Sequence, residues 1–532
     1  MALAVLNSCA LSGISSTLVR TEVHIGAGLP SFLLVGLAST GVKESRDRVR
    51  TAIISSGFEF PVGRITVNLS PADLPKESGR FDLPIALGVL MATGQLRLSP
   101  SQRKALLPHL YFVGELSLSG ALCSIQSPLI LALSIFKSDP QAILVMPRAD
   151  AAMAALVDGL TVIGANSLRD VVAHLESRQI IEASTASDFN GFKDEMADFA
   201  VEGDLCLSDV RGQKQACYLL ELAACGAHSI LLSGPSGVGK TMLAQRLPSI
   251  LPNLSNLQRL ELLAIQSVSA NGIVDTGFRP PHKVPHSSIS DPALLGGGSH
   301  TAYPGEISLA HHGSLFLDEL AEFKRSTLEA LRVPLEAGEI SIARLNSQQI
   351  YPARFQLVAA ANPCACGYLD HPEQTCVCTH RAINQYQSRI SGPLLERIDI
   401  HYKVPPLMTS WIEAEPAEPS EVVRQRVAEC RERQLKRQGV FNAHLKSGQI
   451  RQYCVLSPEL QRELESAAQQ KAWSTRVVQS ILRLARSAAD MRGAEVIEGD
   501  DLAMAIYCRQ PFSKKEEGRI YWHEVRKGSS IN

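Results

Sequence analysis

The residues best suited to chemistry lie near the middle of the chain, where an apolar run at 229–232 leads into GPSGVGKT, residues 234–241. Glycines let backbone N–H groups turn inward around phosphate oxygens at the start of a helix, and the helix-like TMLAQRL follows. Lys240 can then reach the β- and γ-phosphates of a nucleotide, and the Thr241 hydroxyl can ligate Mg²⁺. The order of strand, loop and helix predicts a P-loop, rather than a glycine-rich structural turn. Its nucleotide-binding residues would be Gly234, Pro235, Ser236, Gly237, Val238, Gly239, Lys240 and Thr241.

Two carboxylates close a second apolar run, GSLFLDEL. Asp318 fits a ligand of Mg²⁺, and the neighbouring Glu319 fits a base that polarises an attacking water. A bare Asp-Glu pair after a strand carries little meaning by itself. Together with a P-loop on a nearby strand, the pair predicts a site of nucleotide hydrolysis.

Two further polar residues stand at strand boundaries. The run FQLVAAANP ends at Asn362, whose amide could position a water near the γ-phosphate, although an Asn before Pro363 is also an ordinary turn residue. In SGPLLERIDI, Arg397 lies in a loop before a strand, where an arginine could reach the nucleotide of a neighbouring subunit. The alternative is a surface arginine paired with Glu396.

Four cysteines in two C-x-C pairs follow Asn362 directly: Cys364, Cys366, Cys376 and Cys378. Four thiolates can surround a tetrahedral Zn²⁺ at about 2.3 Å, although C-x-C is tighter than the usual spacing. His371 and His380 are possible substitute ligands, and reduced thiols without an ion are the alternative. Disulfides are the least expected answer, because 12 cysteines in 532 residues are too sparse for a secreted disulfide scaffold. A zinc ion with four protein ligands has no open position, so the sequence predicts a structural metal site.

The bulk composition suits a soluble globular protein of more than one domain, with 52 Lys and Arg against 53 Asp and Glu in 532 residues. The apolar start of the chain lacks a preceding basic stretch and is interrupted by Ser8, Ser12 and Gly13. We therefore expect neither a signal peptide nor a membrane span, and a cytoplasmic location. The small net charge argues against wholesale coating of nucleic acid but leaves a local basic channel open.

The elements that must position these residues fall into successive regions. A strand, glycine-rich loop, helix and strand order recurs around the motifs, which predicts an α/β region with a mostly parallel sheet covered by helices. β-rich runs such as RITVNL precede it, and patterns with three- and four-residue spacing such as VVQSILRLARSAAD follow it. The expected division is an N-terminal domain at 1–183, a linker at 184–204, the α/β core at 205–405, a linker at 406–420, a helical domain at 421–510 and a tail at 511–532.

The motif segments resemble AAA+ ATPases, and within them the magnesium-chelatase-like group that contains the ComM (YifB) family. The resemblance rests on DVRGQKQA, PGEISLAHHGSLFLDELAEF, LRVPLEAGEISIARLNSQQIYPARFQLVAAANPCACGY and SGPLLERIDI. It implies ATP and Mg²⁺ as cofactors, with Gln213 of the first segment at the nucleotide. It also implies that Asn362 is the sensor-1 residue, Arg397 the arginine finger and Arg476 the sensor-2 residue of a helical lid.

The same resemblance implies two insertions that form pore loops in a ring. One is a helix-2 insert within 271–305, and the other is a hairpin before sensor 1 within 338–352. Arg344 on the hairpin and Lys283 in the first insert are candidate DNA contacts. For each, a solvated surface charge is the simpler interpretation, because a single basic side chain carries little information about nucleic acid.

The N-terminal region resembles the Lon-protease-like α+β fold, through GLPSFLLVGL, RITVNLSPADLPKESGRFDLPIALGVLMATGQL and FVGELSLSG. In active members a nucleophilic serine lies in a small turn after a PK-like segment. Here Phe81, Asp82 and Leu83 stand about where that turn should be. Ser78 is nearby but has no demonstrated base, so we expect a non-proteolytic scaffold.

The resemblance implies a homo-hexameric DNA translocase or helicase that uses ATP hydrolysis. Its expected partner is single-stranded or branched DNA, its process is branch migration of DNA joints, and its settings are homologous recombination and natural transformation. Rival interpretations are a motor for inserting Mg²⁺ into a porphyrin, an ATP-dependent protease, and a scaffold that uses ATP only as a conformational switch. The missing nucleophile weakens the protease interpretation.

Overall fold

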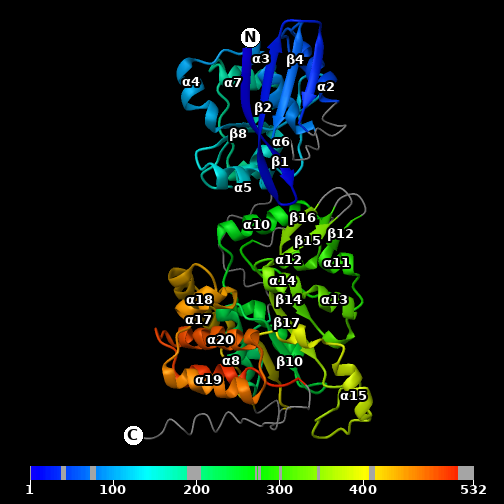
Figure 1. Cartoon of the computed structure of the whole chain (residues 1–532), viewed down its shortest axis with the longest axis vertical. Coiled ribbons are helices and arrows are strands. Elements are labelled where there is room, and N and C mark those ends of the chain that lie inside the picture. The colour runs from blue at the N-terminus through cyan, green and yellow to red at the C-terminus, as the bar shows by residue number, and fades with distance from the viewer. Residues whose placement is uncertain are drawn as a thin grey trace. The chain divides into compact units, whose positions relative to one another are not determined.

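The computed structural model describes residues 2–36, 44–71, 79–188, 205–269, 272–273, 277–298, 302–343, 348–406 and 414–512 of the 532-residue chain. The fold divides into two compact units, both drawn in Figure 1. The first comprises Met1–Glu195 and Arg259–Gly277, and the second comprises Met196–Gln258 and Phe278–Asn532. Among the described residues, no helix combines the length and apolarity that crossing a membrane requires.

A mixed seven-stranded sheet with strand order β3-β4-β2-β1-β5-β8-β9 forms the first unit. On β4, alternate side chains Ile65, Val67 and Leu69 are buried, which is the two-residue period of a sheet with one covered face. They share an apolar cluster with helix α3, whose first nine residues are all buried. The strands of this sheet are β1 (Ala2–Ser12), β2 (Ser15–Gly26), β3 (Ser31–Val35), β4 (Arg64–Ser70), β5 (Leu110–Phe112), β8 (Ile143–Pro147) and β9 (Thr161–Ala165). Strands β6 (Glu115–Leu116) and β7 (Leu122–Cys123) pair with each other in a separate two-stranded sheet. The helices are α2 (Ser45–Ser55), α3 (Asp82–Ala92), α4 (Pro100–Ala105), α5 (Pro128–Ser138), α6 (Arg148–Ala154) and α7 (Leu168–Leu175).

Residues 259–277 group with the first unit, whereas the sequence analysis places them in the region 205–405. Leu260, Leu263 and Ala264 of helix α10 (Asn256–Ser267) join the apolar cluster that contains α5. Their three- and four-residue spacing predicts a helix with one buried face. The spacing of apolar residues does not show whether this face packs in the core of the first unit or of the second. The sequence alone therefore could not assign α10 to the first unit.

A five-stranded sheet with order β11-β14-β17-β10-β18 forms the centre of the second unit, and all its pairings are parallel. This confirms the expected α/β architecture with a parallel sheet. Strands β14 and β17 are buried at every position, so they appear in the sequence as continuous apolar runs instead of alternating ones. The carboxyl ends of parallel strands meet at one edge of a sheet, and the P-loop, Asp318 and Asn362 follow three adjacent strands there.

The remaining elements of the second unit cover this sheet or extend from it. Besides the central strands β10 (Ile230–Ser233), β11 (His282–Lys283), β14 (Ser314–Leu317), β17 (Gln356–Ala361) and β18 (Ile400–Lys403), there are β12 (Gly296–Gly297), β13 (Tyr303–Pro304), β15 (Glu339–Ala343) and β16 (Gln348–Pro352). The helices beside them are α8 (Lys214–Gly226), α9 (Lys240–Ala244), α11 (Asp291–Leu295), α12 (Glu306–Leu309), α13 (Arg325–Ala330), α14 (Arg332–Ala337), α15 (His380–Gln387) and α16 (Gly392–Leu395). Strands β15 and β16 pair antiparallel within the segment 338–352, where the sequence analysis expects a hairpin.

Within residues 414–512, five α-helices pack on one side of this sheet, coloured orange to red in Figure 1. They are α17 (Ser420–Gln438), α18 (Ser447–Tyr453), α19 (Pro458–Gln470), α20 (Thr475–Arg492) and α21 (Gly499–Tyr507). Their apolar faces share one cluster with α8 and with strands β10 and β18. The C-terminal helices and the sheet therefore have a common core.

A buried polar network joins the same helices to the sheet. The Asp399 carboxylate, just before β18, accepts a hydrogen bond from the Ser480 hydroxyl of α20 at 2.6 Å and contacts Nδ1 of His228 at 3.1 Å. The other ring nitrogen of His228 lies 2.7 Å from the Ser487 hydroxyl. Burial opposes ionisation of Asp399, but hydrogen bonding and charge from His228 outweigh it and lower the pKa to about 2.

We expect Asp399→Asn to destabilise the docking of α20 by about 1–3 kcal/mol, because the neutral amide loses the charge-assisted contacts of the carboxylate with His228 and Ser480. The folded pKa lies below the ordinary aspartate value of about 3.9, so the stabilisation is present above pH ~4 and is lost as pH falls towards 2. Chemical denaturation at pH 7 measures the loss. Glu432→Gln, which breaks only an exposed pair with Lys436, is the control and should leave the midpoint unchanged. Equal midpoints for both variants at pH 7 would show that the network contributes nothing.

Candidate functional site

The P-loop leaves the end of β10 and enters α9 at Lys240. Its three glycines, Gly234, Gly237 and Gly239, have φ angles of 155°, 84° and 87°, which other residues rarely adopt. A Cβ atom on Gly234 would also lie 2.7 Å from the Val404 carbonyl oxygen. The loop conformation therefore requires glycine at these positions, as the sequence pattern indicates.

Lys240 is 8 % exposed and lies within the curve of the loop. Its ammonium group donates to the carbonyl oxygens of Gly234 at 2.8 Å and Pro235 at 2.7 Å. Burial lowers the pKa of Lys240, and the charges of Asp318 and Glu319 oppose that shift. Because both hydrogen-bond acceptors are neutral carbonyl groups, the positive charge of Lys240 stays available to attract phosphate.

The two motifs meet where Thr241 contacts Asp318. The Thr241 hydroxyl donates to Oδ2 of Asp318 at 2.9 Å, and the backbone N–H of Glu319 donates to Oδ1 at 2.9 Å. A hydroxyl and a carboxylate side by side are the oxygen ligands that Mg²⁺ uses at nucleotide sites. Glu319 has a left-handed backbone with φ 52° and an exposed side chain.

Gln213 contacts the P-loop from the start of α8. Its buried amide donates from Nε2 to the Val238 carbonyl oxygen at 2.8 Å. The amide oxygen is buried and has no hydrogen-bond partner among the described residues. An unpartnered acceptor can take a hydrogen bond from an amino or hydroxyl group of a nucleotide. Together with the Lys240 cation and the Thr241–Asp318 pair, it makes the site suited to ATP with Mg²⁺.

Asn362 follows the last residue of β17, beside the P-loop. Ala361 pairs with Ser233, and its carbonyl oxygen accepts a hydrogen bond from the Gly234 N–H at 3.3 Å. The strand pairing therefore brings Asn362 to the same edge of the sheet as Lys240 and Asp318.

Arg397 and Arg476 converge on one carboxylate. The Arg397 guanidinium donates to one oxygen of Glu336 at 2.7 Å, and that of Arg476 donates to the other at 2.8 Å. Arg397, foremost, and Arg476 lower the pKa of Glu336. The structure thus pairs Arg397 with Glu336 and not with Glu396, the alternative considered from the sequence. Sequence reasoning missed Glu336, and its place in LEAGEI carries no signal of this role.

The paired arginines lie away from the P-loop of the same chain. Arg397 precedes the amino end of β18, whereas the P-loop follows the carboxyl end of β10. These strands are adjacent and parallel, from Ile230 opposite Ile400 to Ser233 opposite Lys403. The arginines therefore lie near the amino ends of the parallel strands, and the P-loop lies at their carboxyl ends.

The four cysteines converge in the segment between β17 and α15. Their sulfur atoms lie within 4.8 Å of one another, with Cys364 to Cys366 at 3.3 Å, Cys364 to Cys376 at 3.7 Å and Cys366 to Cys376 at 3.5 Å. A tetrahedral zinc site with Zn–S bonds of about 2.3 Å has sulfur separations of about 3.8 Å. The donor set therefore fits a four-thiolate metal site.

The two histidines considered as substitute ligands have other contacts. Nδ1 of His371 accepts hydrogen bonds from the backbone of Glu373 at 3.1 Å and Gln374 at 3.0 Å. Nδ1 of His380 lies 3.1 Å from the amide nitrogen of Asn384. The geometric cluster comprises the cysteines alone among the described residues.

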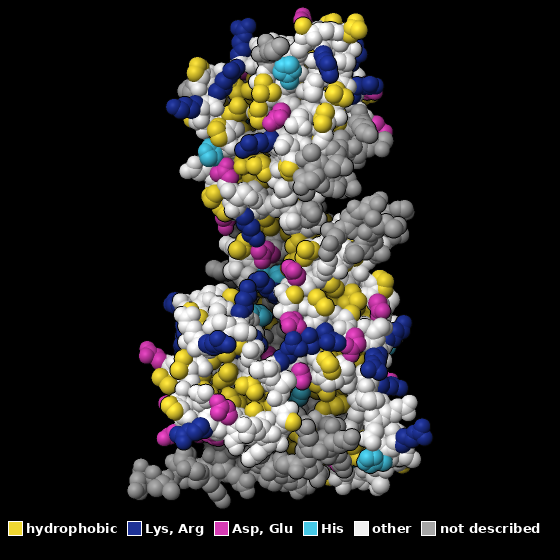
Figure 2. Space-filling model, viewed as in Figure 1, with side chains coloured by type: hydrophobic (Ala, Val, Ile, Leu, Met, Phe, Trp, Pro, Cys, Tyr) yellow, Lys and Arg dark blue, Asp and Glu magenta, His cyan; other side chains and the backbone are white. Residues whose placement is uncertain are grey.

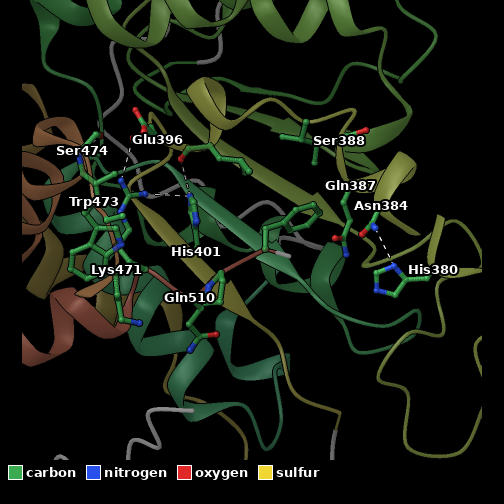
Figure 3. Close-up of a pocket in the computed structure, with 17 residues that line it drawn as sticks. His380, Asn384, Gln387, Ser388, Glu396, His401, Lys471, Trp473, Ser474 and Gln510 are labelled. Carbon is green, nitrogen blue, oxygen red and sulfur yellow. Dashed lines mark hydrogen bonds between the residues drawn. The ribbon is translucent and has the colours of Figure 1, made fainter. Parts of the chain in front are cut away.

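A pocket of about 660 Å³ lies between α15, the region around β18 and the C-terminal helices (Figure 3). Its lining includes His380, Asn384, His401, Trp473 and Gln510. None of the P-loop residues, the acidic pair or the cysteines lines it. Burial lowers the pKa of His401 to about 3, so this imidazole is neutral.

The structure describes one of the two residues predicted to contact DNA. Arg344 lies outside the described residues. Lys283 on β11 is partly exposed and forms an ion pair with Glu306 at 3.6 Å. On the face drawn in Figure 2, basic side chains are interspersed with acidic ones over the second unit. That distribution gives no support to a continuous basic surface on this face.

Three protein families match successive parts of the chain. Residues 206–411 match the family described as magnesium chelatase, subunit ChlI. Residues 21–150 match subunit ChlI of Mg-chelatase, and residues 417–509 match the magnesium chelatase subunit ChlI C-terminal family. The first match contains the P-loop, the acidic pair, the cysteines and Arg397, and the last contains Arg476.

Proteins that are similar over nearly the whole chain support the same family. The chain is 42 % identical over 513 residues to the uncharacterized protein YifB of Escherichia coli, covering 96 % of this chain and 97 % of that protein. It is 40 % identical over 512 residues to the competence protein ComM of Haemophilus influenzae, covering 96 % and 98 %. It is also 40 % identical over 521 residues to the uncharacterized protein Rv2897c of Mycobacterium tuberculosis, covering 97 % and 100 %. The chain belongs to the YifB/ComM family of magnesium-chelatase-like proteins.

Proposed function

We propose that this protein is an ATPase of the AAA+ type. Its catalytic residues lie at the carboxyl ends of the parallel strands, where the P-loop begins. The observation that carries the proposal is the 2.9 Å contact of Thr241 with Asp318 beside the buried Lys240. When bound, ATP supplies the phosphoryl group for transfer and Mg²⁺ neutralises its charge. Lys240 binds the phosphates, Thr241 and Asp318 hold the cation, Glu319 takes a proton from water, and Asn362 orients that water.

The site is completed by a second copy of the chain. Arg397 and Arg476 lie at the opposite edge of the sheet from the P-loop, so one subunit presents nucleotide and the next presents both arginines. The Glu336 carboxylate binds the guanidinium groups of Arg397 and Arg476, to which a phosphate of the neighbouring subunit's nucleotide would otherwise bind. A phosphate carries more charge than a carboxylate and accepts the same forked hydrogen bonds, so it can displace Glu336. Repetition of this head-to-tail contact generates a ring, for which the family resemblance suggests six subunits.

The proposed substrate is a DNA joint, which the ring moves by branch migration. Support comes from the relative named competence protein ComM, since competence concerns uptake of DNA, and from the resemblance stated above. Six copies of a hairpin residue such as Arg344 would contact phosphates together, with a salt dependence that one copy lacks. The C-terminal helices would then act as the lid that carries Arg476. The proposed domain division is the one expected from the sequence, except that residues 259–277 group with the first unit.

Two other functions are candidates. The family descriptions favour a motor for magnesium insertion into a porphyrin, in which the metal ion is cargo. Proteolysis would require a nucleophile near the start of α3, but Phe81, Asp82 and Leu83 are buried there. Asp82 is held by the Arg48 guanidinium at 2.8 Å. We propose that the first unit is a Lon-like scaffold without protease activity.

The decisive test offers the purified protein a synthetic four-way DNA junction, ATP and Mg²⁺ at low salt. We expect Glu319→Gln to retain ATP binding and lose at least about 100-fold of ATPase activity and branch migration, because the base is removed while the phosphate contacts remain. Lys240→Ala should lose binding as well. Glu322→Gln, which changes an exposed carboxylate three residues further on that pairs with Arg389, should behave as wild type.

Two results would count against the proposal in different ways. Wild-type ATPase activity without movement of the junction would remove the DNA function and leave the ATPase. Unchanged ATPase activity in Glu319→Gln would remove the catalytic assignment itself.

We also propose that Cys364, Cys366, Cys376 and Cys378 hold a structural zinc ion. The support is their convergence within 4.8 Å and the fit of the sulfur separations to a tetrahedron. Metal analysis should find about one zinc per wild-type chain and little in a Cys376→Ser, Cys378→Ser double variant. Cys123→Ser, a change at another partly exposed thiol, should keep the zinc. Metal-free wild-type protein, purified without chelator, would contradict the proposal.

A further inference from the structure

The segment that carries the cysteines contacts the P-loop directly. We call residues 364–378 the cysteine loop. The carbonyl oxygen of Gly367 in this loop accepts a hydrogen bond from the backbone N–H of Ser236 at 2.9 Å. Ser236 and Gly237 form the exposed apex of the P-loop. A residue one position after a cysteine ligand therefore holds the apex of the phosphate-binding loop.

A side chain at Gly367 would be strained and would crowd Ser236. Gly367 has a φ of 81°, and a Cβ atom there would lie 3.3 Å from the Cβ of Ser236. The Gly367 N–H donates to the Cys364 carbonyl oxygen at 3.0 Å, which closes a tight turn through both cysteines of the first pair. The position of the Gly367 carbonyl thus follows from the conformation of the Cys364–Cys366 turn.

The cysteine loop is attached to the second unit at two other points. The buried amide of Gln387 donates to the Pro363 carbonyl oxygen at 2.9 Å, just before the loop. The Lys403 ammonium, at the end of β18, lies 2.7 Å from the Asp370 carboxylate. These contacts fix the start and the middle of the loop. The Cys376 sulfur lies 3.7 Å from that of Cys364 and 3.5 Å from that of Cys366, and thiolates this close would repel one another without a central cation.

The P-loop is accordingly held at three places by other segments. The Gly234 N–H donates to Ala361 at its start, the Ser236 N–H donates to Gly367 at its apex, and the Val238 carbonyl accepts from Gln213 towards its end. The backbone N–H groups after the apex are those that turn towards phosphate in a P-loop. Without the hydrogen bond between Ser236 and Gly367, the P-loop residues after Ser236 could adopt other conformations, and the affinity for nucleotide would fall.

We propose that the zinc-closed cysteine loop is a clamp on the P-loop, acting through the Gly367–Ser236 hydrogen bond, so that nucleotide affinity depends on the bound metal. This inference rests on the nucleotide and zinc sites proposed above. It assigns to the metal a role in ATP binding beyond bracing its own loop. The proposed clamp does not depend on a DNA substrate.

The test measures Kd for a fluorescent ADP analogue together with the zinc content of the same samples. Gly367→Ala should keep its zinc and raise Kd by about 5- to 10-fold, since the strained Cβ displaces the carbonyl from Ser236. Gly439→Ala is the matched control, because Gly439 has a φ of 72° but nothing within 4 Å of an added Cβ. It should bind within about twofold of wild type. A zinc-selective chelator should raise the Kd of wild type by at least about fivefold, and returned zinc should restore it.

The outcomes separate the proposals. Equal Kd values for Gly367→Ala and Gly439→Ala, or a wild-type Kd unaffected by zinc removal, would overturn the clamp and leave both sites in place. A zinc-loaded wild type that binds no nucleotide would overturn the ATP site and the clamp with it. Circular dichroism of each variant distinguishes a local loss of affinity from unfolding.

Discussion

The parallel pairing of β10 with β18 is the constraint on which the rest of the arrangement depends. Ser233 at the carboxyl end of β10 leads into the P-loop, while Arg397 stands before the amino end of the adjacent β18. Parallel strands put these two ends at opposite edges of a sheet. The P-loop and Arg397 are therefore separated by the length of these strands. If the arginines act on nucleotide, as proposed, they act on the nucleotide of a neighbouring subunit.

Both edges are held by contacts from segments distant in the sequence. At the arginine edge, Arg397 and Arg476 share Glu336, and the network of Asp399 with His228 joins α20 to the same end of β18. At the P-loop edge, the cysteine loop and Gln213 hold the loop from either side. Because α20 shares one apolar core with β10 and β18, that packing sets the position of Arg476 relative to the sheet.

The sequence predicts the central features because each depends on local pattern. Buried parallel strands are continuous apolar runs, and polar residues such as Asp318 and Asn362 that end them must meet at one edge. What it cannot predict depends on long-range packing. Nothing local identifies Glu336 as the partner of two arginines, places the apolar stripe of α10 in the first unit, or brings Gly367 to Ser236. The role of Arg476 required the family resemblance, because one arginine on an amphipathic helix resembles any other.

The central claim is that one subunit's P-loop works with another subunit's arginines, and mixing two inactive variants tests it most directly. Lys240→Ala lacks a working P-loop but keeps both arginines, and Arg397→Ala lacks the finger but keeps the P-loop. Mixed in equal amounts and allowed to exchange subunits, they should regain about a quarter of wild-type ATPase activity, the share of interfaces that combine the intact halves. Activity no higher than that of either variant alone, with mixed assemblies demonstrated, would contradict the account.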